Sequence, residues 1–414
     1  MSMSFPVHFG RDSRVDLSFS EDRLAARLAA PAPVPDLAER LRDRLENPLE
    51  LPPFRRFFVP GDKVALALDR RTPGAAVLIR EIRGVLVECG VRDEDIVIVQ
   101  PAGLEPGPLP DPRALLPDEA RAAVVWEVHD ATDADRQGYL ASTSRGERVY
   151  LSRRVLDSDV VVSVGWIGFD PVLGYRGTSS VFYPGLSSVE AFKRALGSGH
   201  GELSPDDDRP LRQEVDEIAW LMGSMFSVQV VPSRSGGAFD VLAGAGEAVL
   251  RAGREMLAKQ WRLAVPKRVA TVVVAIDAGD SDETWSQAAT ALAVARNLVV
   301  KGGRIVLVSR LAEAPTPGLE LLRKYKDPQD ALAPLREAQP PDLLSAMQIA
   351  EATRWARVYC LSGLEERLVE DLFMTPLSHE RELRRLLDDD STCAVIESAQ
   401  HAHGEVTAPR RSRG

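Results

Sequence analysis

Cysteine, histidine and long apolar runs are scarce in this sequence of 414 residues. The three cysteines, Cys89, Cys360 and Cys393, are far apart and never form a C-x-x-C pair. This argues against a structural zinc site and fits a reducing compartment. No apolar run reaches the roughly 18 residues of a membrane-spanning helix, and the N-terminal residues lack a signal-peptide pattern. We therefore expect a cytoplasmic protein without a membrane partner.

Positive charge is also in short supply. The chain has 51 Lys and Arg against 61 Asp and Glu, a net charge of -10. A nucleic-acid surface needs a basic patch, so we expect no nucleic-acid partner. The chain contains neither the P-loop pattern G-x-x-x-x-G-K-[ST] nor the hydrolase elbow G-x-S-x-G. These absences argue against a P-loop nucleotidase and an α/β-hydrolase.

What the sequence does contain is a regular alternation of Val-rich runs and amphipathic helical segments. The runs at 63–68, 96–99 and 160–164 recur in the second half at 269–276 and 305–308. Such runs, bounded by charged residues or glycine, are typical of buried parallel strands. We predict two α/β domains with mostly parallel sheets, over residues 1–264 and 265–400, and a flexible tail over 401–414. Hairpins are expected near residues 5–20 and 138–151.

One stretch, Asp157 to Gly185, is the best candidate for a ligand site. The strand Val160–Val164 runs into Gly165 and then into a long loop punctuated by further glycines. In open α/β sheets, ligands bind at the loops that leave the carboxyl ends of the strands. An ordinary strand-to-helix connection explains the stretch equally well.

Charged residues offer further candidates. Asp69 and Arg71 follow the strand at 63–68, and Arg176 lies in the central stretch. A guanidinium group binds carboxylate or phosphate bidentately, although a surface arginine with a carboxylate partner is the simpler interpretation. His129 follows a predicted strand, and His200 lies between glycines. A structural role for His129 and an exposed loop for His200 are the simpler interpretations of the two histidines.

Several segments, in this order, resemble the nickel-dependent lactate racemase family. They are GDKVALALD at 61–69, HDATDADRQGYLASTSRGERVYLSRRVLDSDVVVSVGWI at 129–167, GYRGTSSVFYPG at 174–185 and VATVVVAIDAGDSDETWSQAATALAVARNLVVKGGRIVLV at 269–308. The resemblance covers nearly the whole chain. It implies two α/β domains with an interdomain cleft that holds the ligand.

The resemblance also implies a chemistry: a nickel-pincer nucleotide, tethered to a lysine, accepts a hydride from a 2-hydroxy acid. One family histidine completes the nickel shell, and two others act as acid and base. The family positions carry different residues here: Ser180 for the lysine, Leu104 and Asp170 for the acid and base, and Leu196, four residues before His200, for the nickel ligand. The family's D-x-T-R-P loop becomes Asp69-Arg-Arg-Thr-Pro73, and only Gln287 survives from its Y-Q-x-x-K motif.

We therefore expect a divergent protein that binds a small hydroxy acid or carboxylate without the tethered cofactor. In this hypothesis Asp69 and Arg71 orient the ligand, Arg176 pairs with its carboxylate, Gln287 contributes from the second domain, and Asp170 is the acid or base. Two alternatives stay open. One is a non-catalytic protein that senses a ligand or binds a partner. The other is an active 2-hydroxy-acid racemase or epimerase that holds nickel through His200 or His129.

Overall fold

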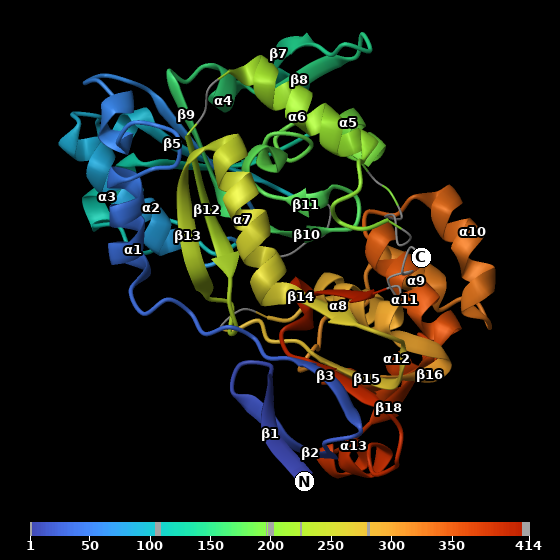
Figure 1. The fold of residues 1–414 in the computed structure, drawn as a ribbon. Helices are drawn as coiled ribbons and strands as arrows, with labels where there is room; N and C mark the ends of the chain where they lie inside the picture. Colours follow the sequence, from blue (N-terminus) through green and yellow to red (C-terminus); the bar gives the residue numbers. More distant parts are fainter. Residues whose placement is uncertain are drawn as a thin grey trace, which may run out of the picture. The chain divides into compact units, whose positions relative to one another are not determined.

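The computed structural model describes residues 2–103, 109–195, 197, 203–223, 226–279 and 282–407. Contacts divide the chain into two units (Figure 1). One comprises Pro33–Pro232 and Gly237–Leu257, and the other comprises Met1–Ala32, Ser233–Gly236 and Ala258–Gly414. The predicted division placed residues 1–264 together. Residues 1–32 instead join the second half because β3 pairs with β19, with Cys393 opposite Leu24.

The first unit is built on a six-stranded sheet in the order β13-β12-β9-β4-β5-β6. All neighbouring strands run parallel except β12 and β13. The bounds of its strands are β4 Val64–Leu68, β5 Ile96–Pro101, β6 Val125–His129, β9 Val160–Trp166, β12 Phe226–Pro232 and β13 Ala238–Ala245. Two antiparallel hairpins stand outside this sheet: β7 Gln137–Ser142 with β8 Arg148–Ser152, and β10 Gly168–Asp170 with β11 Gly174–Arg176.

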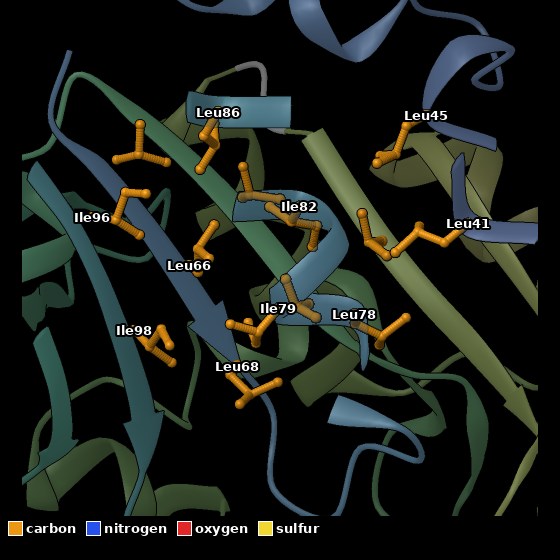
Figure 2. Close-up of a cluster of buried hydrophobic side chains, with 14 of the residues drawn as sticks. Leu41, Leu45, Leu66, Leu68, Leu78, Ile79, Ile82, Leu86, Ile96 and Ile98 are labelled. Carbon is orange, nitrogen blue, oxygen red and sulfur yellow. The ribbon is translucent and has the colours of Figure 1, made fainter. Parts of the chain in front are cut away.

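The helices of this unit cover both faces of the sheet. Alternate residues of β4 and β5, such as Leu66 and Ile98, pack against α1 and α2 (Figure 2). Ala67 and Val99 point to the opposite face, where they meet α4 and η4. The sheet is therefore buried on both sides, as continuous apolar strands require. The helices are α1 Leu37–Glu46, η1 Phe54–Phe57, α2 Ala75–Glu88, η2 Asp93–Asp95, α3 Asp118–Ala123, η3 Ala134–Arg136, α4 Arg153–Leu156, η4 Thr178–Val181, α5 Val189–Ala195, α6 Pro210–Met222 and α7 Gly246–Trp261, whose residues from Ala258 on belong to the second unit.

The second unit contains a six-stranded, fully parallel sheet in the order β18-β17-β16-β15-β19-β3. An N-terminal hairpin and α13 pack on one face through a cluster that includes Phe9, Val306 and Leu383. Helix α8 packs against β15 and β16, and α11 packs against α8. The predicted hairpin near residues 5–20 is confirmed as β1 and β2.

The bounds of the second unit's elements are β1 Ser2–Phe9, β2 Ser13–Ser20, β3 Leu24–Leu28, β14 Arg262–Val265, β15 Val269–Ala275, α8 Trp285–Leu298, β16 Val299–Val308, α9 Pro317–Leu322, α10 Pro328–Ala338, α11 Leu343–Trp355, β17 Arg357–Leu361, α12 Glu366–Asp371, β18 Met374–Leu377, α13 Glu380–Leu386, β19 Cys393–Ile396, η5 Ala399–His401 and β20 His403–Val406. The prediction of two α/β units with mostly parallel sheets is confirmed.

The C-terminal residues differ from the predicted flexible tail. β20 pairs in parallel with β14, with His403 opposite Arg262. His401 is buried against Trp261, with 5.4 Å between the ring centroids, and burial lowers the pKa of this histidine to about 4. The sequence around His401 and His403 is polar, but strand pairing fixes this segment to the second unit. Residues 408–414 lie outside the described residues.

Candidate functional site

In the sheet of the first unit, the direction in which the chain adds strands reverses between β4 and β9. From β4 the chain adds β5 and β6 on one side, and it then returns to place β9 and β12 on the other. The loops that leave β4 and β9 therefore start side by side and separate. Such a switch point, at the carboxyl ends of parallel strands, is where open α/β sheets bind ligands. Asp69 follows β4 directly, and Trp166 ends β9.

Asp69 is buried and held from several directions. Its backbone N–H donates to Val164 O at 2.8 Å, and its backbone carbonyl accepts from the Thr72 hydroxyl at 2.7 Å. Its carboxylate accepts from the backbone N–H of Arg70 at 2.8 Å and from Arg176 Nη2 at 3.0 and 2.7 Å. The predicted candidates Asp69 and Arg176 thus meet directly at the switch point.

Arg176 ends β11 and is fixed by two contacts. Besides the Asp69 carboxylate, its guanidinium lies 4.3 Å from the ring centroid of Trp166, whose Nε1 donates to Arg70 O at 3.1 Å. Burial disfavours the charged guanidinium, but the carboxylates of Asp69 and Asp170 outweigh this effect and raise the pKa of Arg176. The side chain as a whole is 29% exposed, whereas its Nε is buried.

Gly165 permits a close approach of polar groups beneath this pair. A Cβ atom at this position would lie 3.0 Å from Gln229 Oε1 and 3.1 Å from Asp69 Cβ. Gln229 is buried on β12, and its Nε2 donates to Ser163 Oγ at 3.4 Å. Ser163 in turn shares a 2.7 Å hydrogen bond with Ser227. Among the described residues, Gln229 Oε1 and Arg176 Nε have no hydrogen-bond partner.

The sequence analysis did not identify Ser163, Ser227 and Gln229 as candidates. The signal that could have identified them is their position within apolar strands, in VVVSVG and FSVQVV. Burying a polar group costs free energy unless the group is hydrogen-bonded. Two serines and a glutamine in two adjacent buried strands therefore indicate a polar site.

Asp170 lies in a hairpin rather than in the long loop that the sequence predicted. β10 and β11 pair through residues 168–176, with Asp170 opposite Gly174. Asp170 Oδ1 accepts the backbone N–H groups of Val172 and Leu173, both at 2.8 Å. One oxygen of this carboxylate therefore stabilises the turn between the two strands.

The remaining candidates have local roles or lie apart. Arg71 is exposed and has a left-handed backbone with φ of 54°. Gln287 belongs to the second unit, where its Oε1 accepts the backbone N–H of Thr284 at 3.0 Å and caps α8. The predicted cleft, where Gln287 would meet the Asp69 loop, stays a prediction.

At the positions that correspond to the family's reactive groups, the described side chains make structural hydrogen bonds. Ser180 Oγ accepts the backbone N–H of Gly177 at 3.0 Å and caps the short helix η4. His129 is buried, and its Nε2 donates to Ser187 O at 2.8 Å, which is a structural role. Leu104, Leu196 and His200 lie outside the described residues. Within the described part of the chain, no group of three His, Cys, Asp or Glu side chains is arranged to hold a metal ion.

Comparison with known proteins agrees with this fold. The profile of the lactate racemase N-terminal domain family matches residues 10–195. Residues 10–195 are therefore similar to the lactate racemase N-terminal domain. The matched residues contain β4, β9 and the Asp69–Arg176 pair, and the match confirms the predicted resemblance.

Individual relatives extend the similarity beyond this domain. The chain is 20% identical over 286 residues to lactate racemase from Thermoanaerobacterium thermosaccharolyticum, covering 65% of this chain and 67% of that protein. The structure of the lactate racemase apoprotein from the same organism matches with a TM-score of 0.79 at 18% identity, covering 97% of this chain and all of that one. A crystal structure of a Thermotoga maritima protein matches with a TM-score of 0.67 at 14% identity, covering 89% and 98%. At these identities the solved structures establish the fold.

No helix among the described residues is both long and apolar enough to cross a membrane.

Proposed function

We propose that this protein binds a small carboxylate, such as a 2-hydroxy acid, at the carboxyl ends of β4 and β9. The observation that carries the proposal is that Arg176 is both fixed and partly exposed. Asp69 and Trp166 position its guanidinium, and the side chain is 29% exposed. A guanidinium has five N–H donors, and Asp69 uses only one of its two terminal nitrogens, so donors remain for a ligand carboxylate.

The nickel-pincer nucleotide does not fit the residues present. At the lysine position Ser180 has no amine for a covalent link, and its hydroxyl is engaged with Gly177 N–H. At one acid–base position Asp170 uses a carboxylate oxygen to stabilise its own turn. We therefore propose that the ligand binds without this tethered cofactor, in a cytoplasmic protein.

Two roles are compatible with such binding. If the protein is an enzyme of the racemase or epimerase type, Asp170 is the candidate acid or base, because its charge acts on Arg176. The non-catalytic alternative, ligand sensing, is supported by the local structural use of both Asp170 and Ser180. An active nickel enzyme with relocated ligands finds no support at His129, which is buried and bonded to Ser187 O.

The proposal is tested by titrating the protein with lactate and other 2-hydroxy acids and with their uncharged amides. We expect the acids to bind saturably and the amides not to bind. Arg176→Gln should weaken binding at least about tenfold, because a charge-assisted pair is lost. Arg145→Gln, in the exposed turn between β7 and β8, is the matched control and should leave affinity unchanged. Equal affinity of the Arg176→Gln and Arg145→Gln variants would reject Arg176 as the carboxylate site.

A further inference from the structure

A cavity lies within the unit formed by the C-terminal half and the N-terminal hairpin. Its volume is about 520 Å³, which is in the size range of small-molecule sites. Its charged lining side chains include Arg310, Arg381 and Arg384, with Glu380 beside them. The resemblance and the domain assignment give these residues no role.

The cavity lies where the second sheet would bind a ligand. Strands β16, β17 and β18 are parallel neighbours, so their carboxyl ends share one edge. Arg310 comes two residues after β16, Leu361 ends β17, and α13 starts three residues after β18. The lining therefore comes from successive strand-end loops, as in other open α/β sheets.

The charge balance of this cavity is unusual for the chain. Three arginines face one glutamate, whereas the whole protein has a net charge of -10. Among these arginines, Arg384 forms an ion pair with Glu380, with 3.7 Å between Nη2 and Oε2, and both side chains are well exposed. Arg310 and Arg381 form no ion pair with any described carboxylate. Ser378, which also lines the cavity, donates hydrogen bonds to the carboxylates of Glu366 and Glu382, so these two residues offset part of the positive charge. Among the side chains of the lining itself, arginines still outnumber carboxylates, and this excess attracts an anion.

Arg310 is also held in place before any ligand arrives. Its backbone N–H donates to the buried Glu283 carboxylate at 2.7 Å. Its side-chain Nε donates to Ser13 Oγ at 2.9 Å, and its guanidinium lies 5.1 Å from the ring centroid of Phe9. The N-terminal hairpin and the C-terminal sheet thus position this cation together, which lowers the entropy cost of binding.

We propose that this cavity binds the phosphate group of a small organic phosphate monoester. A phosphate monoester has about two negative charges and three terminal oxygens on one centre, which suits a cavity lined by three arginine side chains. The cavity is far larger than a phosphate ion, and Phe9 and Leu361 supply apolar wall for an organic part. The site is independent of the proposed carboxylate site at Arg176.

The 414-residue protein is titrated calorimetrically at pH 8 with phenyl phosphate, inorganic phosphate, phenol and succinate. We expect saturable binding of phenyl phosphate, weaker binding of inorganic phosphate and no binding of phenol. The variant with Arg381→Gln and Arg384→Gln should bind phenyl phosphate at least about tenfold more weakly, because two charge-assisted contacts are removed. Arg336→Gln, on the exposed face of α10, is the matched control and should bind like the wild type.

The assignment fails if phenyl phosphate shows no saturable binding, or if the double variant binds as tightly as the Arg336→Gln control. Succinate binding as tightly as phenyl phosphate would also contradict it, because the ligand class would then be a dicarboxylate. If the double variant does not fold, Arg381→Gln replaces it, since Arg381 has no ion pair among the described residues. Unchanged affinity in that single variant would overturn the proposal.

Discussion

Asp69 and Arg176 are 107 residues apart in sequence, and both carboxylate oxygens of Asp69 accept hydrogen bonds from one nitrogen of Arg176, at 3.0 and 2.7 Å. The pair joins the loop after β4 to the hairpin after β9, at the switch point of the first sheet. Asp69 is buried, whereas Arg176 is 29% exposed. The carboxylate therefore positions the guanidinium, and the guanidinium is the group that can meet a ligand.

The first prediction concerns this positioning. Asp69→Asn removes the charge that holds Arg176, so we expect ligand affinity to fall about tenfold and the free energy of unfolding to fall by ~1–3 kcal/mol. Titration with 2-hydroxy acids and urea unfolding measure the two effects. Asp157→Asn, at an exposed residue after α4, is the control. An Asp69→Asn variant that binds like this control would show that Arg176 needs no positioning.

A second prediction separates the two roles of Asp170. Because an amide oxygen accepts the same backbone N–H groups, Asp170→Asn should unfold at a urea concentration close to that of the wild type. Asp170→Ala should be less stable by ~1–2 kcal/mol, since two hydrogen bonds to the turn are lost. If Asp170 is also an acid or base, Asp170→Asn abolishes turnover of any racemised substrate while it remains folded. Equal stability of the Asn and Ala variants would contradict the structural role.

A third prediction concerns the cap that Ser180 provides for the short helix η4. Ser180→Ala removes the acceptor for Gly177 N–H, so the free energy of unfolding should fall by ~1 kcal/mol with no change in ligand affinity. Ser179→Ala is the matched control, because Ser179 is also half-buried and its side chain has no hydrogen bond to any residue that the structure describes. A loss of affinity in Ser180→Ala without a loss of stability would place Ser180 in the ligand site instead.

The free energy of unfolding should depend on pH because the pKa of Glu283 is raised in the folded protein. Burial raises its pKa from 4.5 to about 7, assisted by Asp277 and opposed by hydrogen bonds from the N–H groups of Arg310 and Gly10. The folded state therefore holds a proton that the unfolded state releases above pH 4.5. This contribution to stability is complete below about pH 4.5 and is lost as the pH rises through 7, by roughly 3 kcal/mol in all.

The measurement compares urea unfolding of the wild type and Glu283→Gln at several pH values. Between pH 5 and pH 8 the wild type should lose stability relative to the variant, because glutamine does not titrate. A constant difference between the two proteins across this range would show that the pKa of Glu283 is not raised.

The sequence predicts much of the fold because the strands are unusually apolar. The runs at 63–68, 96–99 and 160–164 correspond to β4, β5 and β9. Asp69 was predicted as a ligand contact from its place directly after a strand, and Arg176 from its place in the stretch Asp157 to Gly185. Their pairing with each other was not predicted, because no local pattern specifies which of many carboxylates an arginine meets.

Long-range pairing accounts for the features that the sequence did not reveal. β3 joins β19 across most of the chain, so the N-terminal residues belong to the second unit. His401 looks like part of a polar tail, yet it is buried because β20 pairs with β14. The polar set Ser163, Ser227 and Gln229 forms only when β9 and β12 become neighbours. Each depends on contacts between segments that are distant in sequence.

The central claim is a lactate racemase-like fold that works without the tethered nickel-pincer cofactor. The most direct test is to measure nickel content and intact mass after purification from a host that makes this cofactor. The account predicts no retained nickel after dialysis and a mass equal to that of the 45.2 kDa polypeptide. About one nickel per chain, together with a covalent mass increase, would contradict it.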